Sequence, residues 1–195
     1  MRRPAVVLMV GEPGSGKTRL GVSLAGALRL PFLARDDVRT GLYFTAGAWS
    51  ERPGPVPPAD AAVETFLRLV ETMAALGVSC VAEYVVRDER PEDMARITAV
   101  ARCVGVRTAC ADAPARRADR ARTDRLLARR PVLDALGYRS VGEHTARAEV
   151  RMAAVTAQMR TVFDFPVLEV DTNDGYDPPL DDIVDFVARS TSRPG

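Results

Sequence analysis

Short apolar runs alternate with stretches of helical periodicity along most of the chain. The apolar runs predict five strands, over Ala5–Val10, Phe32–Ala34, Val78–Val86, Val106–Ala111 and Val167–Val170. Between them, apolar residues at helical spacing predict helices over Gly16–Leu30, Asp36–Phe44, Ala59–Leu76, Pro91–Val104, Ala115–Arg130, Glu143–Phe163 and Leu180–Ala188. This alternation favours an α/β fold with about five parallel strands and helices on both faces. In such a fold a ligand binds at the carboxyl ends of the strands.

Turn-forming residues set the predicted boundaries. Asp36 is expected to cap the second helix, and Gly105 to end the helix that Pro91 begins. Residues Thr45–Pro58 contain two glycines, four prolines and the only tryptophan, which predicts an irregular segment. Because no shift in composition divides the chain, residues 1–195 are expected to form a single domain whose last residues, 190–195, fray.

The composition excludes several classes of protein. A chain of 195 residues with 47% hydrophobic residues and a net charge of +1 can bury a core and lacks the bias of a disordered polymer. Its apolar run Ala5–Val10 is far shorter than the roughly 20 residues of a membrane-spanning helix, and too short for a signal peptide. Three cysteines without a CxxC spacing fit reduced, buried thiols, and a single histidine argues against a zinc site. We therefore expect a cytoplasmic protein with no membrane partner.

The strongest motif is Gly11-Glu12-Pro13-Gly14-Ser15-Gly16-Lys17-Thr18, which matches GxxxxGK[ST] and joins the first predicted strand to the first predicted helix. Glycines in such a loop let backbone N–H groups curl around the α- and β-phosphates of a nucleotide. Lys17, the only lysine among 27 basic residues, would reach the β- and γ-phosphates, and the Thr18 hydroxyl would bind Mg²⁺. The candidate nucleotide-binding residues here are Gly11, Gly14, Ser15, Gly16, Lys17 and Thr18.

A second polar segment, Arg35-Asp36-Asp37-Val38-Arg39, follows the second predicted strand and should face the γ-phosphate. A carboxylate there can accept the proton of an acceptor hydroxyl, and an arginine one turn later can hold the acceptor or the phosphoryl group. The alternative is that Asp36 only caps the helix and that Arg39 is solvated.

Together, GEPGSGKT and ARDDVR resemble the small P-loop kinases, a group that includes phage-type polynucleotide 5′-hydroxyl kinases, zeta toxins and chloramphenicol phosphotransferase. The resemblance implies a P-loop NTPase three-layer sandwich in which Asp36 is the general base and Arg39 contacts the acceptor or a phosphate. It also suggests that Glu83, near the end of the third predicted strand, contacts the acceptor or the magnesium shell. The alternative is a strand-end surface residue, because an ordinary Walker B strand carries Asp at that place.

The region after the fourth predicted strand is rich in arginine. Seven arginines and two aspartates fall within residues 116–130, a local balance of +5. Kinases of this kind carry arginines on a lid that closes over the triphosphate, so the resemblance implies an Arg-rich helical lid over about residues 115–142. Arg122 and Arg125 are the preferred catalytic candidates, since a guanidinium can bridge phosphate oxygens. The alternative is a solvated helix face.

Two further segments are candidates for ligand contact. In similar kinases the loop after the last strand, here Asp171-Thr172-Asn173, borders the adenine, which makes Thr172 a candidate nucleotide contact; a polar turn is the alternative. Related kinases build the acceptor pocket where residues 43–58 lie. Trp49 there would stack on a flat acceptor or anchor the segment by packing.

These residues together predict a kinase that uses ATP and Mg²⁺. Lys17, Thr18 and the lid arginines would hold the triphosphate while Asp36 orients an acceptor hydroxyl for in-line attack. A nucleotide-dependent switch ATPase is the alternative class. Because the net charge is only +1, a small hydroxylated metabolite or antibiotic is the expected acceptor, and a nucleic-acid 5′-hydroxyl is the second candidate.

Overall fold

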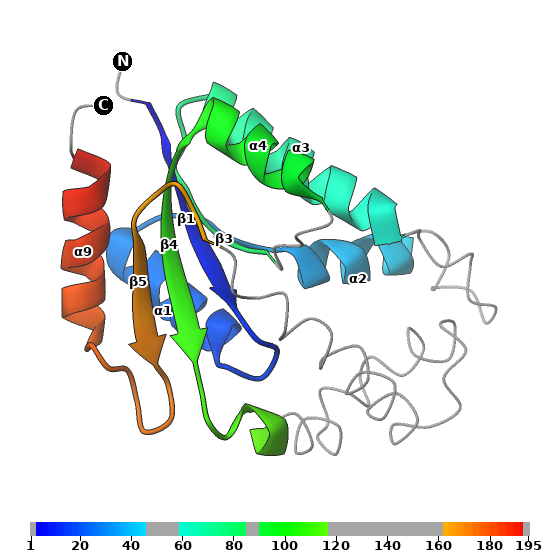
Figure 1. Ribbon diagram of the computed structural model, residues 1–195. Helices are drawn as coiled ribbons and strands as arrows, with labels where there is room; N and C mark the ends of the chain where they lie inside the picture. The colour runs from blue at the N-terminus through cyan, green and yellow to red at the C-terminus, as the bar shows by residue number, and fades with distance from the viewer. Residues whose placement is uncertain (1–2, 46–58, 85–89, 117–161, 193–195) are drawn as a thin grey trace, which may run out of the picture.

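The computed structural model describes residues 3–45, 59–84, 90–116 and 162–192. Its centre is a five-stranded sheet in the order β2-β3-β1-β4-β5, in which all paired strands run parallel (Figure 1). The strands are β1 (Ala5–Gly11), β2 (Phe32–Ala34), β3 (Cys80–Glu83), β4 (Arg102–Ala109) and β5 (Val167–Asp171). The predicted architecture of about five parallel strands is therefore confirmed.

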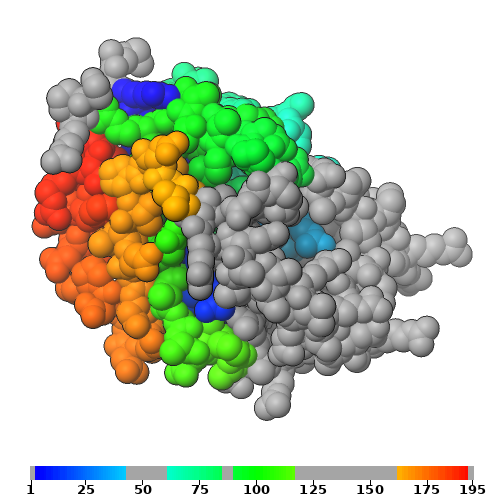
Figure 2. All heavy atoms as spheres, viewed as in Figure 1, coloured from blue at the N-terminus to red at the C-terminus, as the bar shows by residue number. Residues whose placement is uncertain are grey.

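Helices cover both faces of this sheet, as predicted. One face carries α1 (Lys17–Leu28) and α9 (Leu180–Ser192), and the other carries α3 (Ala59–Ala75) and α4 (Pro91–Val100), with α2 (Arg35–Thr45) beside α3 (Figure 1). The space-filling view shows β5 and α9, in orange to red, along one flank of the visible surface (Figure 2).

Strand β1 is buried on both faces, which explains its uninterrupted apolar sequence. Val6, Leu8 and Val10 pack into the core under α3 and α4. Val7 and Met9 point the other way, into the core formed with α1 and α9. The two cores fix the strand from both sides, and with it the loop that follows.

Parallel pairing brings the carboxyl ends of the strands to one edge of the sheet. Ala34 at the end of β2 is in register with Glu83 at the end of β3, and Glu83 is in register with Met9 of β1. On the other side of β1, Gly11 is in register with Thr108 of β4. Segments far apart in the sequence, namely the loop after β1, the start of α2 and the end of β3, therefore meet at this edge.

The largest correction concerns Gly105, which was predicted to end a helix that reached Val104. Helix α4 ends at Val100, and both residues lie inside β4. A Cβ atom at Gly105 would lie 2.9 Å from a methyl carbon of Val167 on β5, so this glycine allows close approach of a side chain and does not stop a helix. Arg102 already starts the strand pairing, because its N–H donates to the Pro4 carbonyl at 2.8 Å.

Other boundaries differ by a few residues. Helix α2 begins at Arg35, so Asp36 lies in its first turn and does not precede the helix as a cap. Strand β3 is shorter than predicted and ends at Glu83. Val162 and Phe163, the predicted end of a helix, are not helical.

At the C-terminus, α9 continues through Ser192, although residues 190–195 were expected to fray. The Arg102 guanidinium donates to the Thr191 carbonyl at 2.9 Å, which gives one carbonyl of the last turn a partner. The Thr191 and Ser192 hydroxyls also bind carbonyls one turn earlier, at 2.9 and 2.7 Å.

The three cysteines are free and buried, as the sequence predicts. Burial raises the pKa of the Cys80 and Cys103 thiols to about 11, so these thiols are poor nucleophiles at neutral pH. Within the described ranges, no helix is long and apolar enough to cross a membrane.

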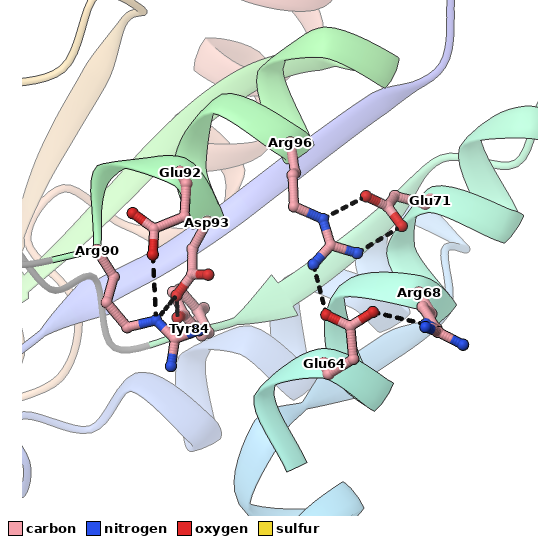
Figure 3. Close-up of polar contacts among 8 residues, drawn as sticks. All are labelled: Glu64, Arg68, Glu71, Tyr84, Arg90, Glu92, Asp93 and Arg96. Atoms are coloured by element: carbon pink, nitrogen blue, oxygen red, sulfur yellow. Dashed lines mark hydrogen bonds and ion pairs between the residues drawn. The ribbon is translucent and has the colours of Figure 1, made fainter. Parts of the chain in front are cut away.

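An ion-pair network joins α3 to α4 (Figure 3). Arg96 of α4 donates two hydrogen bonds to the Glu71 carboxylate, at 2.7 and 2.8 Å, and a third to Glu64 at 2.7 Å. Arg68 binds the other oxygen of Glu64 at 2.6 Å. These guanidinium contacts, first of all that of Arg96, lower the pKa of Glu64 to about 2, and Arg96 also lowers the pKa of Glu71.

Replacing Arg96 with glutamine is expected to change the pH dependence of stability. A carboxylate whose pKa is lowered by folding stabilises the protein above its ordinary pKa of 4.5, and this contribution is lost as the pH falls through the lowered value of about 2. Arg96→Gln should therefore lower the melting temperature at neutral pH and flatten its decline between pH 4.5 and about 2. Thermal unfolding at a series of pH values measures both effects. Arg189→Gln, whose exposed pair with Asp185 spans 4.0 Å, is the control, and equal pH profiles for Arg96→Gln and wild type would contradict the prediction.

Candidate functional site: a phosphate-binding loop at the carboxyl edge

The loop between β1 and α1 has the backbone of an anion-binding turn. Gly11, Gly14 and Gly16 adopt φ angles of 140°, 91° and 83°, which residues other than glycine rarely adopt. Gly11 also lacks room for a side chain, since an added Cβ would lie 2.5 Å from the Thr108 carbonyl oxygen. Gly16 is the N-cap of α1, where no side chain accepts a hydrogen bond from the backbone and no acidic residue occupies the first turn. The N-terminal end of α1 is therefore open to an anion.

The side chain of Lys17 lies inside this loop. It is 5% exposed, and its ammonium group donates to the Glu12 carbonyl at 2.8 Å. The same carbonyl accepts the Ser15 N–H at 3.1 Å and the Ser15 hydroxyl at 2.6 Å. Lys17 is thus folded back across the loop and desolvated, a position from which an ammonium group can bind a phosphate oxygen in place of a carbonyl.

Two threonine hydroxyl groups, one from β4 and one from the residue after β5, contact Ser15 of the loop. Thr108 Oγ1 of β4 lies 2.6 Å from Ser15 Oγ, so the two hydroxyl groups share a hydrogen bond. Thr172, which follows β5, donates to the Ser15 carbonyl at 2.8 Å. All three hydroxyl-bearing residues are buried. The sequence prediction included Ser15 and Thr172 but missed Thr108, which follows Arg107 in β4 and belongs to no motif.

The start of α2 brings the predicted general base to the same edge of the sheet. The Asp36 carboxylate accepts a hydrogen bond from the Arg35 guanidinium at 2.6 Å, and 56% of its side chain is exposed. Asp37 is its exposed neighbour in the first turn of the helix, and Arg39 lies one turn further on, half-buried. An exposed carboxylate in this position is within reach of an acceptor hydroxyl, which suits proton acceptance.

Glu83 lies beside this segment, at the end of β3. Its Oε2 atom is buried without a hydrogen-bond partner, and the same holds for Nε of Arg35; within the described residues these are the two buried side-chain polar atoms of this kind. A buried polar atom without a partner costs about 1–3 kcal/mol. Arg35 directly follows Ala34, and Ala34 is in register with Glu83, so the two atoms belong to residues at adjacent places along this edge of the sheet. The Glu83 side chain is thus half-buried, with one carboxylate oxygen withdrawn from solvent.

The residue after Glu83 is fixed by a buried polar cluster, shown in Figure 3. The Tyr84 hydroxyl binds the Asp93 carboxylate in the first turn of α4, and Arg90 Nε lies 3.3 Å from the same carboxylate. Tyr84 and Asp93 are 1% and 2% exposed, and the Tyr84 ring stacks on Phe66 of α3. This cluster anchors the carboxyl end of β3 to two helices and so holds the Glu83 backbone in place.

Several predicted site residues lie outside the described residues. Trp49 belongs to residues 46–58, and Arg122 and Arg125 belong to residues 117–161. Of the predicted lid, residues 115–116 are described and are helical. Arg116, the first arginine of the Arg-rich segment, donates to the backbone carbonyls of Thr172 and Asn173.

The donor groups present fit Mg²⁺ bound together with a nucleotide. Within the described ranges, no group of three His, Cys, Asp or Glu residues could hold a metal ion by itself. Thr18 follows Lys17 at the start of α1 and is half-buried at the open helix end. Mg²⁺ commonly keeps few protein ligands and takes the rest from phosphates and water, so one hydroxyl beside a phosphate-binding loop is sufficient.

Comparison with known proteins agrees with this geometry. The AAA_33 family model, described as an AAA domain, matches residues 6–166. Among curated proteins no significant match is found.

Solved structures share the fold over nearly the whole chain. A "putative kinase" from Chloroflexus aurantiacus is 24% identical, with a TM-score of 0.63 and coverage of 96% of this chain and 98% of that chain. The Mycobacterium tuberculosis APS kinase, in complex with AMPPNP and APS, is 16% identical, with a TM-score of 0.55 and coverage of 96% and 99%. Chaetomium thermophilum Kti12, in complex with ADP-AlF3, is 13% identical, with a TM-score of 0.58 and coverage of 97% and 100%. The predicted P-loop NTPase fold is confirmed.

Proposed function

The chain belongs to the AAA_33 family, and we propose from its site that it is a kinase that transfers the γ-phosphate of Mg-ATP to a hydroxyl group of a small-molecule acceptor. One observation carries this proposal: the phosphate-binding loop, with Lys17 folded inside it, shares one sheet edge with the carboxylates of Asp36 and Glu83. A switch ATPase also holds Mg²⁺ with a carboxylate on the strand next to the loop, so Asp36, in the first turn of the helix that follows β2, is the residue that favours transfer to an acceptor.

The residues of the loop would hold the nucleotide. Backbone N–H groups of Gly14 and Gly16 would bind the α- and β-phosphates, and Lys17 would leave the Glu12 carbonyl for the β- and γ-phosphates. Thr18 would bind Mg²⁺, which neutralises charge on the phosphate oxygens when it is bound. That the APS kinase and Kti12 structures contain AMPPNP and ADP-AlF3 supports ATP as the nucleotide.

The carboxylates would position the acceptor. Asp36 would accept the proton of the acceptor hydroxyl. The oxygen of that hydroxyl would form a bond to the γ-phosphorus while the bond between the γ-phosphorus and the bridging oxygen breaks and releases ADP. Arg39 would contact the acceptor or the transferred group. Glu83, with its orphaned oxygen, would accept a hydrogen bond from a further acceptor hydroxyl or from the magnesium shell. Trp49 and the lid arginines Arg122 and Arg125 complete the proposed site.

Charge favours a small acceptor over a nucleic acid. The chain carries a net charge of +1 and has a pI of about 7.7, whereas binding along a nucleic-acid backbone needs an extended basic surface. The positive charge concentrated at residues 116–130 would be neutralised by the triphosphate itself. The APS kinase structure is a complex with AMPPNP and APS, and not with a nucleic acid, which supports the same choice.

Transfer of label from γ-labelled Mg-ATP tests the proposal. The protein is offered a pool of hydroxylated metabolites and antibiotics in one reaction and 5′-hydroxyl oligonucleotides in another, with Asp36→Asn in parallel. Label on a small molecule, lost in the variant, is the expected result, and mass spectrometry then identifies the acceptor. Label on the oligonucleotide would make the protein a polynucleotide kinase. Free phosphate alone, released equally by Asp36→Asn, would favour a switch ATPase.

A further inference from the structure

Arg116 makes an unusual contact with the backbone. Its Nη2 nitrogen donates to two successive carbonyls, that of Thr172 at 2.8 Å and that of Asn173 at 2.7 Å. Both carbonyls belong to the loop between β5 and α9, 56 and 57 residues away in the sequence. Hydrogen bonds from a charged donor are stronger than neutral ones, so one guanidinium fixes the orientation of two peptide groups.

The same loop is tied to the end of β4 by further contacts. The Thr172 N–H donates to the Ala109 carbonyl at 3.0 Å, and Asn173 Oδ1 accepts the Asp112 N–H at 3.4 Å. Asn173 in turn donates its own N–H to the Asp171 carboxylate at 2.7 Å. The loop after β5 is thus held in one conformation by the segment that leads into the Arg-rich region.

From this loop the connection continues to the phosphate-binding loop. The Thr172 hydroxyl, on a side chain that is 4% exposed, donates to the Ser15 carbonyl at 2.8 Å. Because a trans peptide group is planar, its carbonyl and its N–H point in opposite directions. Holding the Ser15 carbonyl toward Thr172 therefore turns the Gly16 N–H away from Thr172, toward the inside of the loop.

We propose that Arg116 is a positioning residue for nucleotide binding: it fixes Thr172, and through the Thr172 hydroxyl it fixes the Ser15–Gly16 peptide that faces the phosphates. The proposal rests on the proposed nucleotide site and adds a residue to it. It also gives the Arg-rich segment a direct mechanical link to the phosphate-binding loop, since Arg116 is the first arginine of that segment.

Binding measurements on the full chain test this link without any acceptor. The probes are AMPPNP and inorganic tripolyphosphate, each with Mg²⁺, titrated by calorimetry. The variants are Arg116→Ala, Arg116→Lys, Thr172→Val and the double variant Arg116→Ala with Thr172→Val. Arg102→Ala is the matched control, because Arg102 also donates to a backbone carbonyl, that of Thr191 at 2.9 Å, but at the amino end of β4.

We expect Arg116→Ala and Thr172→Val each to weaken binding of both probes about tenfold, in line with the loss of a buried or charge-assisted hydrogen bond. The double variant should have about the same affinity for each probe as the single variant with the lower affinity, because the two residues act in series. Arg116→Lys should recover part of the loss, and Arg102→Ala should leave both affinities unchanged while lowering the melting temperature.

Other results would overturn the proposal. Additive losses in the double variant would mean that Arg116 and Thr172 act independently. A loss confined to AMPPNP, with tripolyphosphate binding intact, would place the effect at the base and not at the phosphate-binding loop. Unchanged affinities in Arg116→Ala, or in Thr172→Val if the Arg116→Ala variant does not fold, would break the link from Arg116 to the phosphate-binding loop. Absence of AMPPNP binding by the wild type would instead remove the proposed function.

Discussion

Replacing Lys17 with alanine is expected to lower γ-phosphate transfer by at least about 100-fold, the usual effect of removing a group that stabilises charge in the transition state. Lys17 is the only lysine of the chain and is 5% exposed inside the phosphate-binding loop. No other ammonium group can replace it, and an alanine leaves the γ-phosphate without this partner. Transfer kinetics with labelled Mg-ATP measure the loss.

The control for this variant is Arg19→Ala. Arg19 lies two residues further on α1, and its side chain is exposed, so its removal alters the charge of the helix without changing the loop. Lys17→Ala should keep the circular dichroism spectrum of the wild type, because the Ser15 N–H and hydroxyl still bind the Glu12 carbonyl. Unchanged turnover in a folded Lys17→Ala protein would exclude the P-loop mechanism.

The phosphate-binding loop was predictable because its chemistry is local. Eight consecutive residues supply the glycines, the lysine and the hydroxyl, and the flanking patterns supply the strand and the helix. The structure adds conformation to the same residues, with positive φ angles at Gly11, Gly14 and Gly16. Asp36 and Glu83 were also placed at the correct edge, because strand ends in a parallel sheet share one side.

What the sequence could not indicate depends on register between distant strands. Thr108 contacts Ser15 because the pairing of β4 with β1 puts Thr108 in register with Gly11. These two residues are 97 positions apart in the sequence, and no local pattern encodes their pairing. The misassigned Gly105 has the same origin. A glycine after an apolar stretch has the pattern of a helix stop, whereas its actual role is to make room for Val167 on the neighbouring strand. Arg116 was visible as one of seven clustered arginines, but its partners are backbone carbonyls, which carry no sequence signal.

Replacing Asp36 with asparagine is expected to retain nucleotide binding and to lower transfer by about 100-fold or more, as is usual for the loss of a general base. The competing role is structural, since Asp36 lies in the first turn of α2 and pairs with Arg35 at 2.6 Å. An exposed carboxylate in that position contributes only about 0.3–1 kcal/mol through the helix dipole.

Asp37→Asn separates the two roles, because Asp37 is an exposed carboxylate in the same first turn and loses the same interaction with the helix dipole. If Asp36 accepts the proton, Asp36→Asn should lose transfer while Asp37→Asn keeps it, with similar melting temperatures for both variants. Their AMPPNP affinities should match that of the wild type, since neither carboxylate belongs to the phosphate-binding loop. If Asp36→Asn keeps transfer as well as Asp37→Asn does, Asp36 only stabilises the helix. Glu83 would then be the next candidate for the proton acceptor, because its carboxylate oxygen without a hydrogen-bond partner lies at the adjacent strand end.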